Sequence, residues 1–158
     1  MVVLLFAVFT LFSAGLSFKR KYESSPTTGL RNDEAVLQLP GYPYDSVHQT
    51  LIIAMSAQCL NCSNQIPFYK NLLRIERDSG RSLRVVAVFP ETREAVDEYT
   101  HKNGFSDVTT IAPFNLRSLN IRSVPTLLIV DSSGRLRDFW IGEVSEATHR
   151  KVLDSLGL

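Results

Sequence analysis

The sequence predicts an α/β domain with a central mixed β-sheet flanked by helices. An apolar run at 51–55 is followed by helical spacing and then by a β-branched run at 83–89, a pattern typical of parallel strands joined by a crossover helix. A third apolar run at 126–130 ends in the turn 131–134 (Asp-Ser-Ser-Gly), which indicates a hairpin of antiparallel strands. Parallel and antiparallel neighbours together make the sheet mixed.

The size and charge of the chain indicate one domain of ordinary size with an appendage. The chain has 158 residues, of which 17 are basic and 16 are acidic. This near balance does not indicate a basic face for nucleic acid, so we expect no nucleic-acid partner. We expect a monomer that needs no cofactor.

Residues 1–18 are predicted to form a hydrophobic helix, either a membrane anchor or a signal segment. The run 2–18 is almost wholly uncharged and is followed by the basic residues 19–21. Its length barely matches the hydrocarbon core of a bilayer, so both alternatives stay open. No basic segment precedes the run, and Ser13-Ala14-Gly15 is only a loose cleavage site, which favours a retained anchor.

Residues 19–34 are expected to form a polar linker, and the domain is expected to span 35–158. The linker contains Ser-Ser-Pro-Thr-Thr-Gly at 24–29, a composition typical of flexible connections. The apolar segment 35–39 predicts a short edge strand beside the central strands, and the Pro-Gly-Tyr-Pro sequence at 40–43 then breaks the chain.

Cys59 and Cys62 are the only cysteines, and they lie between the first predicted strand and the helix after it. Each is therefore the other's only possible intrachain disulfide partner. The unpaired N–H groups and partial positive charge of a helix N-terminus favour a thiolate over a thiol. Cys59, nearer the helix end, is the predicted attacking thiolate, and Cys62 is the resolving thiol that closes the disulfide.

Two alternatives to redox chemistry exist for this cysteine pair. A structural zinc site usually needs four ligands, and the histidines, His48, His101 and His149, are scattered without ligand spacing. A purely structural disulfide is unusual at this spacing, because so small a loop restrains the unfolded chain only weakly. The pattern therefore favours a redox-active Cys59–Cys62 disulfide.

The remaining elements follow from helical spacing and from helix start signals. Pro67 lies inside the helix after the cysteines and should bend it, because proline removes one backbone hydrogen bond. Pro90 opens a second predicted helix at 91–102, and Ser145 caps the last helix. A short strand is predicted at 108–111 and a helical turn at 114–119. The residues expected to face the core from these helices are Ile66, Tyr69, Leu72, Leu73, Ala95, Val96, Tyr99, Val152, Leu153 and Leu156.

The strand, the Cys-x-x-Cys pair and the helix with Pro67 resemble the thioredoxin superfamily. Ser-Val-Pro-Thr at 123–126, just before an apolar run, is similar to the cis-proline loop of that superfamily. The resemblance covers about residues 46–157 and implies a thioredoxin-like fold. Within this superfamily, the chain resembles membrane-anchored extracytoplasmic thiol-disulfide oxidoreductases in particular. This resemblance implies a domain on the outer, periplasmic side. The basic residues 19–21 conflict with this orientation, because the positive-inside rule would hold the domain in the cytoplasm.

The resemblance also implies a docking surface for a substrate chain. An X-Pro bond adopts the cis form at low cost, and a cis Pro125 would leave the Val124 backbone free to pair with a substrate strand. Gln58 and Thr126 are the other expected substrate contacts. Gln58 stands where thioredoxins usually have tryptophan, so the flat apolar surface there is reduced.

A proton acceptor for Cys62 is less well defined. Many thioredoxins have an aspartate in the strand before the cysteines, but that position here is Ile53. Glu91, in Phe-Pro-Glu-Thr, matches a glutamate of extracytoplasmic relatives and would take the proton. Alternatively, Glu91 is a solvated first-turn glutamate of its own helix. Leu60 and Asn61 add no positive charge beside the thiolate, which argues against a strong oxidant.

The predicted function is reduction or exchange of disulfides in cysteine-containing proteins, with an unidentified protein as electron donor or acceptor. A peroxiredoxin-like peroxide reductase is one alternative, although 52–58 lacks the Pro and Thr that usually precede a peroxidatic cysteine. A copper-delivery module is another, and it usually needs a distant histidine. His101 and His149 fall in predicted helices without a spaced partner, so we expect no metal site.

Overall fold

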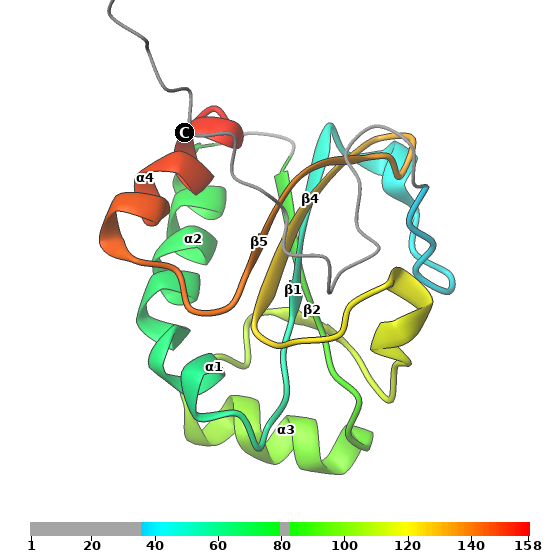
Figure 1. Ribbon diagram of the computed structural model, residues 1–158, viewed down its shortest axis with the longest axis vertical. Helices are drawn as coiled ribbons and strands as arrows, with labels where there is room; N and C mark the ends of the chain where they lie inside the picture. The colour runs from blue at the N-terminus through cyan, green and yellow to red at the C-terminus, as the bar shows by residue number, and fades with distance from the viewer. Residues whose placement is uncertain (1–35, 80–82) are drawn as a thin grey trace, which may run out of the picture.

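The computed structural model describes residues 36–79 and 83–158 (Figure 1). The strands are β1 (Gln49–Ala54), β2 (Leu83–Val88), β3 (Thr109–Ile111), β4 (Thr126–Asp131) and β5 (Leu136–Ile141). The helices are α1 (Leu60–Asn64), α2 (Ile66–Ser79), α3 (Arg93–Lys102) and α4 (Glu146–Ser155), together with the 3-10 helices η1 (Tyr44–Ser46) and η2 (Leu116–Leu119).

The strands form one mixed sheet, as the sequence predicts. Their order is β3-β2-β1-β4-β5. Strands β1, β2 and β3 run parallel to one another, whereas β4 is antiparallel to both β1 and β5. Strand β1 lies at the centre with a partner on each side and a helix or loop layer on each face, which explains its unbroken apolar run at 51–55.

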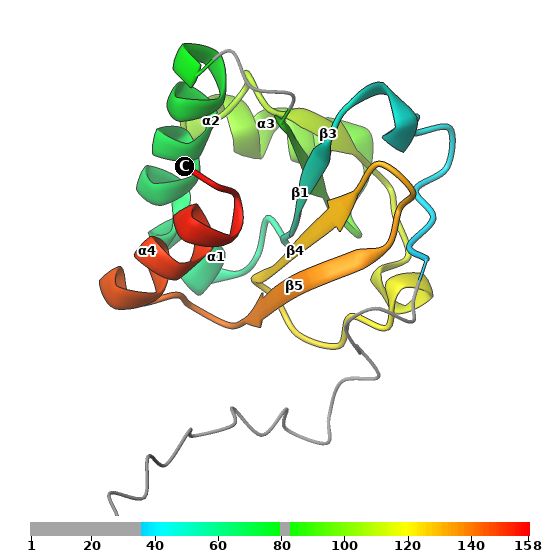
Figure 2. The same ribbon diagram turned by 90° about the horizontal axis from the view of Figure 1, so that it is seen from above.

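Side chains on the two faces of the sheet enter two separate cores. Leu51 and Ile53 of β1 pack in one core with residues of α2, α3 and α4. Ile52 and Ala54 pack in the other core, against the segment 37–39 and η2. Figure 2 shows α2 and α4 on one side of the sheet and the yellow segment that contains η2 on the other. The alternation follows from the two-residue period of a strand.

The helix after the cysteines is interrupted just before Pro67. Helix α1 ends at Asn64 and α2 begins at Ile66. The N–H of Gln65 turns to the Cys62 carbonyl oxygen at 3.2 Å, and Pro67 has no N–H to continue the ladder. The predicted bend is therefore present as a break between two helices.

The segment 36–39 is not an edge strand, so that prediction was wrong; residue 35 lies outside the described residues. Val36 forms an isolated bridge to Arg135, and the Leu37 N–H donates to the Gly134 carbonyl at 2.8 Å. The segment thus meets the β4–β5 turn and not the central strands. Leu37 and Leu39 are buried in the second core. Their burial gives the sequence the same alternation of apolar residues as a paired strand, so the pattern alone does not distinguish the two.

Helix α3 begins at Arg93, two residues later than the prediction of 91–102. Thr92 is the N-cap, and its side chain accepts the Ala95 N–H, a bond that fixes where the helix starts. Glu91 therefore lies before the helix and not in its first turn. Glu94 is the acidic residue of that first turn.

The predicted anchor at 1–18 and linker at 19–34 lie outside the described residues. Within 36–79 and 83–158, none of the helices combines the length and the apolar character that a membrane span requires. The membrane anchor therefore stays a prediction from the sequence.

Candidate active site

The register of the central strands brings three distant segments to one edge of the sheet. Ala54, the last residue of β1, pairs with Val88 at the end of β2 and with Thr126 at the start of β4. The loop after β1 leads to Cys59, the loop after β2 leads to Glu91, and Pro125 precedes β4. The predicted catalytic residues therefore share one edge because of strand pairing.

Cys59 occupies the N-cap position of α1. Its Sγ atom accepts the Cys62 backbone N–H at 3.2 Å, and the side chain is partly exposed. Both cysteines are free thiols in this structure. The Cys59 sulfur therefore lies against a backbone N–H group at the start of α1.

Cys62 lies one turn further into α1 and is fully buried. Burial raises the pKa of its thiol to about 12, and the hydrogen bond with Cys59 and the negative charge of Glu91 act in the same direction. A hydrogen bond with the Ser56 backbone opposes them in part. The two cysteines therefore differ in solvent exposure, and Cys62 needs a nearby proton acceptor to become a thiolate.

The loop before β4 lies directly against Cys59. The Val124–Pro125 peptide bond is cis, as expected from the sequence. The Cys59 thiol faces the Val124 carbonyl oxygen at 3.6 Å. Within the described part of the chain, the Val124 backbone makes no backbone–backbone hydrogen bond. This half-buried residue therefore offers an N–H and a carbonyl group beside the sulfur.

The two other predicted substrate contacts differ in position. Gln58 is exposed, and its N–H donates to the Ser56 hydroxyl oxygen at 3.2 Å. Thr126 is 1% exposed, and its hydroxyl donates to the Ser123 carbonyl at 2.7 Å. The expectation for Thr126 therefore needs correction, because its side chain supports the loop from inside and is not offered to a substrate.

Glu91 reaches back to the loop that carries the cysteines. Its Oε1 atom accepts the Ser56 hydroxyl at 2.5 Å and the Ala57 N–H at 3.1 Å. Its Oε2 atom is buried, with no hydrogen-bond partner among the described residues. The position before the helix and these contacts contradict the alternative of a solvated first-turn glutamate. The carboxylate therefore keeps one vacant acceptor oxygen, and its charge acts on the Cys62 thiol.

Two further residues lie beside the cysteines, and the sequence indicated a contact role for neither: Ser56 was not singled out, and Leu60 was noted only for its lack of charge. Ser56 joins Glu91 to the active-site loop, a role that depends on a contact across 35 residues. Leu60, directly after Cys59, is 74% exposed, which is unusual for leucine. Its place between the cysteines was the only available signal. It provides an apolar contact surface beside the sulfur.

The histidines are not gathered around the cysteines. No group of three or more His, Cys, Asp or Glu side chains in the described ranges could hold a metal ion. His101 is exposed on α3. His149 of α4 stacks on Phe68 of α2, with ring centroids 3.7 Å apart and planes at 6°. The ring of His149 therefore serves the packing of two helices.

Comparisons with known proteins agree with the fold. No protein-family model and no curated protein sequence matches the chain. A thiol-disulfide isomerase from Corynebacterium glutamicum matches with a TM-score of 0.60 and 19% identity, over 80% of this chain and 94% of that one. StoA from Bacillus subtilis matches with a TM-score of 0.57 and 14% identity, over 70% and 84% of the two chains.

A third solved structure, a thioredoxin-like protein in its oxidized form, matches with a TM-score of 0.58 and 21% identity. It covers 84% of this chain and 95% of its own. One of these neighbours is thus a thiol-disulfide isomerase and another is a thioredoxin-like protein. Together with the mixed sheet, the Cys-x-x-Cys pair at a helix N-terminus and the cis-proline loop, they show that this chain has the thioredoxin-like fold.

Proposed function

We propose that this protein is a thiol-disulfide oxidoreductase that cycles Cys59 and Cys62 between dithiol and disulfide. One observation carries the proposal: the Cys59 sulfur accepts an N–H at the start of α1 and lies 3.6 Å from the Val124 carbonyl of the cis-proline loop. Nucleophile and docking backbone are thus adjacent, as attack on a disulfide in an extended chain requires.

In the first step the Cys59 thiolate attacks one sulfur of a substrate disulfide. A new bond forms between Cys59 and that sulfur, and the old S–S bond breaks. Its electron pair leaves with the second substrate sulfur, which takes up a proton. The Val124 N–H and carbonyl would pair with the backbone next to the attacked cysteine, while Leu60 and Gln58 contact the substrate from the other side of the sulfur.

In the second step Cys62 attacks Cys59 and releases the substrate as a thiol. The Cys62 proton must leave first, because its pKa is raised to about 12. Glu91 is the proposed acceptor, acting directly or through one water molecule from its unpaired Oε2. The product is the Cys59–Cys62 disulfide, and a dithiol protein would return the two electrons. The same steps in reverse would oxidise a substrate.

The proposal includes a membrane location. The apolar run 2–18 would anchor the protein, with the domain on the extracytoplasmic side and a cysteine-containing protein as substrate. The support is the sequence of the run and the resemblance to anchored oxidoreductases. Fractionation of cells that express the full chain, with protease added from outside, tests both points. Recovery of an intact domain from the soluble cytoplasm would reject them.

The test of activity is insulin reduction by the full chain in mild detergent, with dithiothreitol as the electron source. Wild-type protein is expected to accelerate insulin precipitation, and Cys59→Ser is expected to show only the background rate. Ser63→Ala is the matched control, since Ser63 is on the same helix and is not a sulfur nucleophile. Equal rates for wild type and Cys59→Ser would refute the catalytic assignment.

A further inference from the structure

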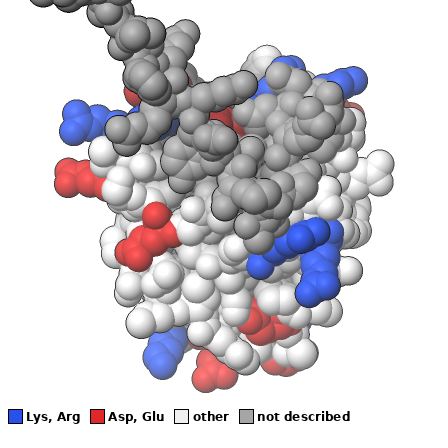
Figure 3. All heavy atoms as spheres, in the orientation of Figure 1, with Lys and Arg blue, Asp and Glu red and all other residues white. Residues whose placement is uncertain are grey.

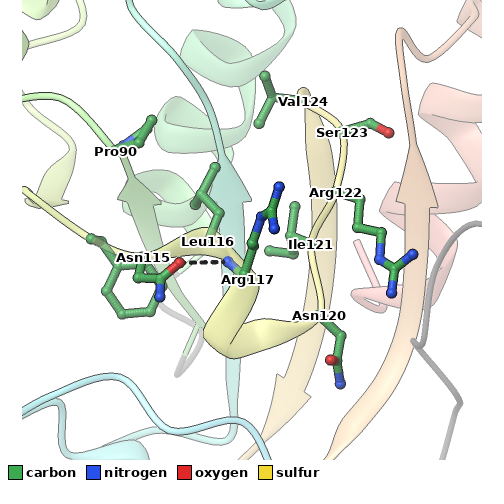
Figure 4. Close-up of a pocket in the computed structure, with 10 residues that line it drawn as sticks. Pro90, Asn115, Leu116, Arg117, Asn120, Ile121, Arg122, Ser123 and Val124 are labelled. Atoms are coloured by element: carbon green, nitrogen blue, oxygen red, sulfur yellow. Dashed lines mark hydrogen bonds between the residues drawn. The ribbon is translucent and has the colours of Figure 1, made fainter.

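A groove adjoins the proposed active site on the side of the cis-proline loop (Figure 4). It has a volume of about 620 Å³ and is formed by Pro90 and by residues 114–117 and 120–124. Val124 belongs both to this groove and to the contact with Cys59. A chain that pairs with Val124 therefore has a continuous path from the sulfur into the groove.

The groove has an apolar floor and a basic rim. Phe114 and Ile121 are buried at 7% and 2% exposure and form part of the floor. The rim carries exposed polar side chains, which are Asn115, Arg117, Asn120, Arg122 and Ser123. Among the described residues, no Asp or Glu lines the groove. In the space-filling view, basic side chains gather over the region of η2 and the loop that follows it (Figure 3).

The two rim arginines are not used by the fold. Four other arginines, Arg74, Arg77, Arg93 and Arg137, form ion pairs with Asp side chains. Arg117 and Arg122 form neither an ion pair nor a side-chain hydrogen bond within the described part of the chain. Glu91, which follows Pro90 of the groove, is turned away toward Ser56 and Ala57. No acidic side chain in the described ranges therefore forms an ion pair with either rim arginine.

We infer that the groove binds an acidic segment of the protein substrate, next to the cysteine that Cys59 attacks. This inference rests on the proposed function and adds a substrate class to it. Carboxylates complement guanidinium groups through charge-assisted hydrogen bonds. Arg122 lies two residues before Val124, so a strand paired along this loop brings residues about two to four positions from the cysteine within reach of the rim.

Charge selection of this kind acts mainly on the rate of productive encounter. Exposed charges steer association and discriminate against partners of like charge, and salt weakens the effect. Each exposed pair contributes little by itself. Together, the two arginines are expected to give a preference on the order of 5-fold for an acidic over a neutral substrate at low salt.

The test uses three synthetic peptides that differ only near one cysteine, with Asp, Asn or Lys at the second, third and fourth positions on each side of it. The cysteine is activated as a mixed disulfide with uncharged 2-thiopyridine, whose release is followed by absorbance. Cys59 bonds to the peptide sulfur, thiopyridone leaves with the electron pair, and Cys62 then releases the peptide thiol. The protein is the reduced full chain in mild detergent.

Wild-type protein is expected to react fastest with the Asp peptide and slowest with the Lys peptide. An Arg117→Gln, Arg122→Gln double variant should lose this order. Its rate with 2,2′-dipyridyl disulfide, which has no peptide, should not change. Arg150→Gln, an exposed substitution on α4 across the sheet, should keep the order. High salt should reduce the preference of the wild type.

The outcomes separate the inference from the proposed function. Equal wild-type rates for the three peptides, or an order retained by the double variant, would overturn the acidic groove while the disulfide chemistry stands. No reaction of wild type even with dipyridyl disulfide would refute the proposed function. Circular dichroism of each variant confirms that a lost preference does not reflect a lost fold.

Discussion

The Cys59 sulfur and the Val124 carbonyl oxygen lie 3.6 Å apart, although 65 residues separate them in the chain. The antiparallel pairing of β1 with β4 produces this contact, since Ala54 pairs with Thr126. The Cys59 sulfur thus faces a backbone segment that forms no backbone–backbone hydrogen bond at Val124 among the described residues. In the proposed function, one pair of strands therefore places the attacking sulfur beside the backbone that would dock the substrate.

The two thiols are expected to react with alkylating agents at very different rates. Cys59 is partly exposed, whereas Cys62 is fully buried with a pKa of about 12. Only thiolates react at useful rates, so iodoacetamide at neutral pH should modify Cys59 more than ~10-fold faster than Cys62. Mass spectrometry of tryptic peptides from the reduced protein measures both rates. Equal rates would contradict the assigned roles.

Glu91→Gln tests the proton acceptor, because glutamine keeps an oxygen for Ser56 and Ala57 but cannot take up a proton. If Glu91 acts only through its charge, its removal lowers the pKa of Cys62 and speeds release of the mixed disulfide. If Glu91 is the proton acceptor, its removal should slow that release by ~10-fold or more. Stopped-flow kinetics at several pH values, with thiopyridine-activated peptide, distinguishes the two directions.

Glu94→Gln is the matched control for this experiment. Glu94 is in the first turn of α3 and is fully exposed. Its substitution should leave the release of the mixed disulfide unchanged. A slower release in both variants would indicate a general effect of negative charge near the start of α3 and would remove the assigned role of Glu91.

His149 should make the protein less stable in mild acid. Burial lowers the pKa of its imidazole, so the unfolded chain binds a proton at a higher pH than the folded one. Stability is then full above the unfolded pKa of about 6.5 and falls as the pH drops below it. Urea unfolding between pH 7 and 5.5 should show this slope, reduced in His149→Gln and unchanged in His101→Gln. A steeper slope in His149→Gln would show that the sign is wrong.

Removal of the hydroxyl group from two buried tyrosines should change the stability of the protein in different ways. The Tyr69 hydroxyl is buried without a hydrogen-bond partner in the described residues, whereas that of Tyr99 lies 3.1 Å from the Ser63 hydroxyl. Tyr69→Phe should leave the free energy of unfolding unchanged or raise it by about 1 kcal/mol, and Tyr99→Phe should lower it by about 1 kcal/mol. Urea unfolding measures both. A loss in Tyr69→Phe would indicate a bound water at that hydroxyl.

Much of the fold was predictable, because strands and helices leave local patterns. The runs at 51–55, 83–89 and 126–130 became β1, β2 and β4 with boundaries shifted by at most two residues. The helix faces were largely correct, since Ile66, Tyr69 and Leu72 are all buried. Local periodicity failed at 36–39, where burial against a turn produces the same pattern as a strand.

The sequence by itself determined the cysteine pair, the helix that begins beside it and the proline that precedes the fourth strand, since adjacent residues specify all three. The tertiary structure decided how these pieces meet. Strand register brought Glu91 to Ser56, turned Thr126 inward and opened a groove beside Val124. Such contacts join residues tens of positions apart, and only the pairing of strands specifies which of them come together.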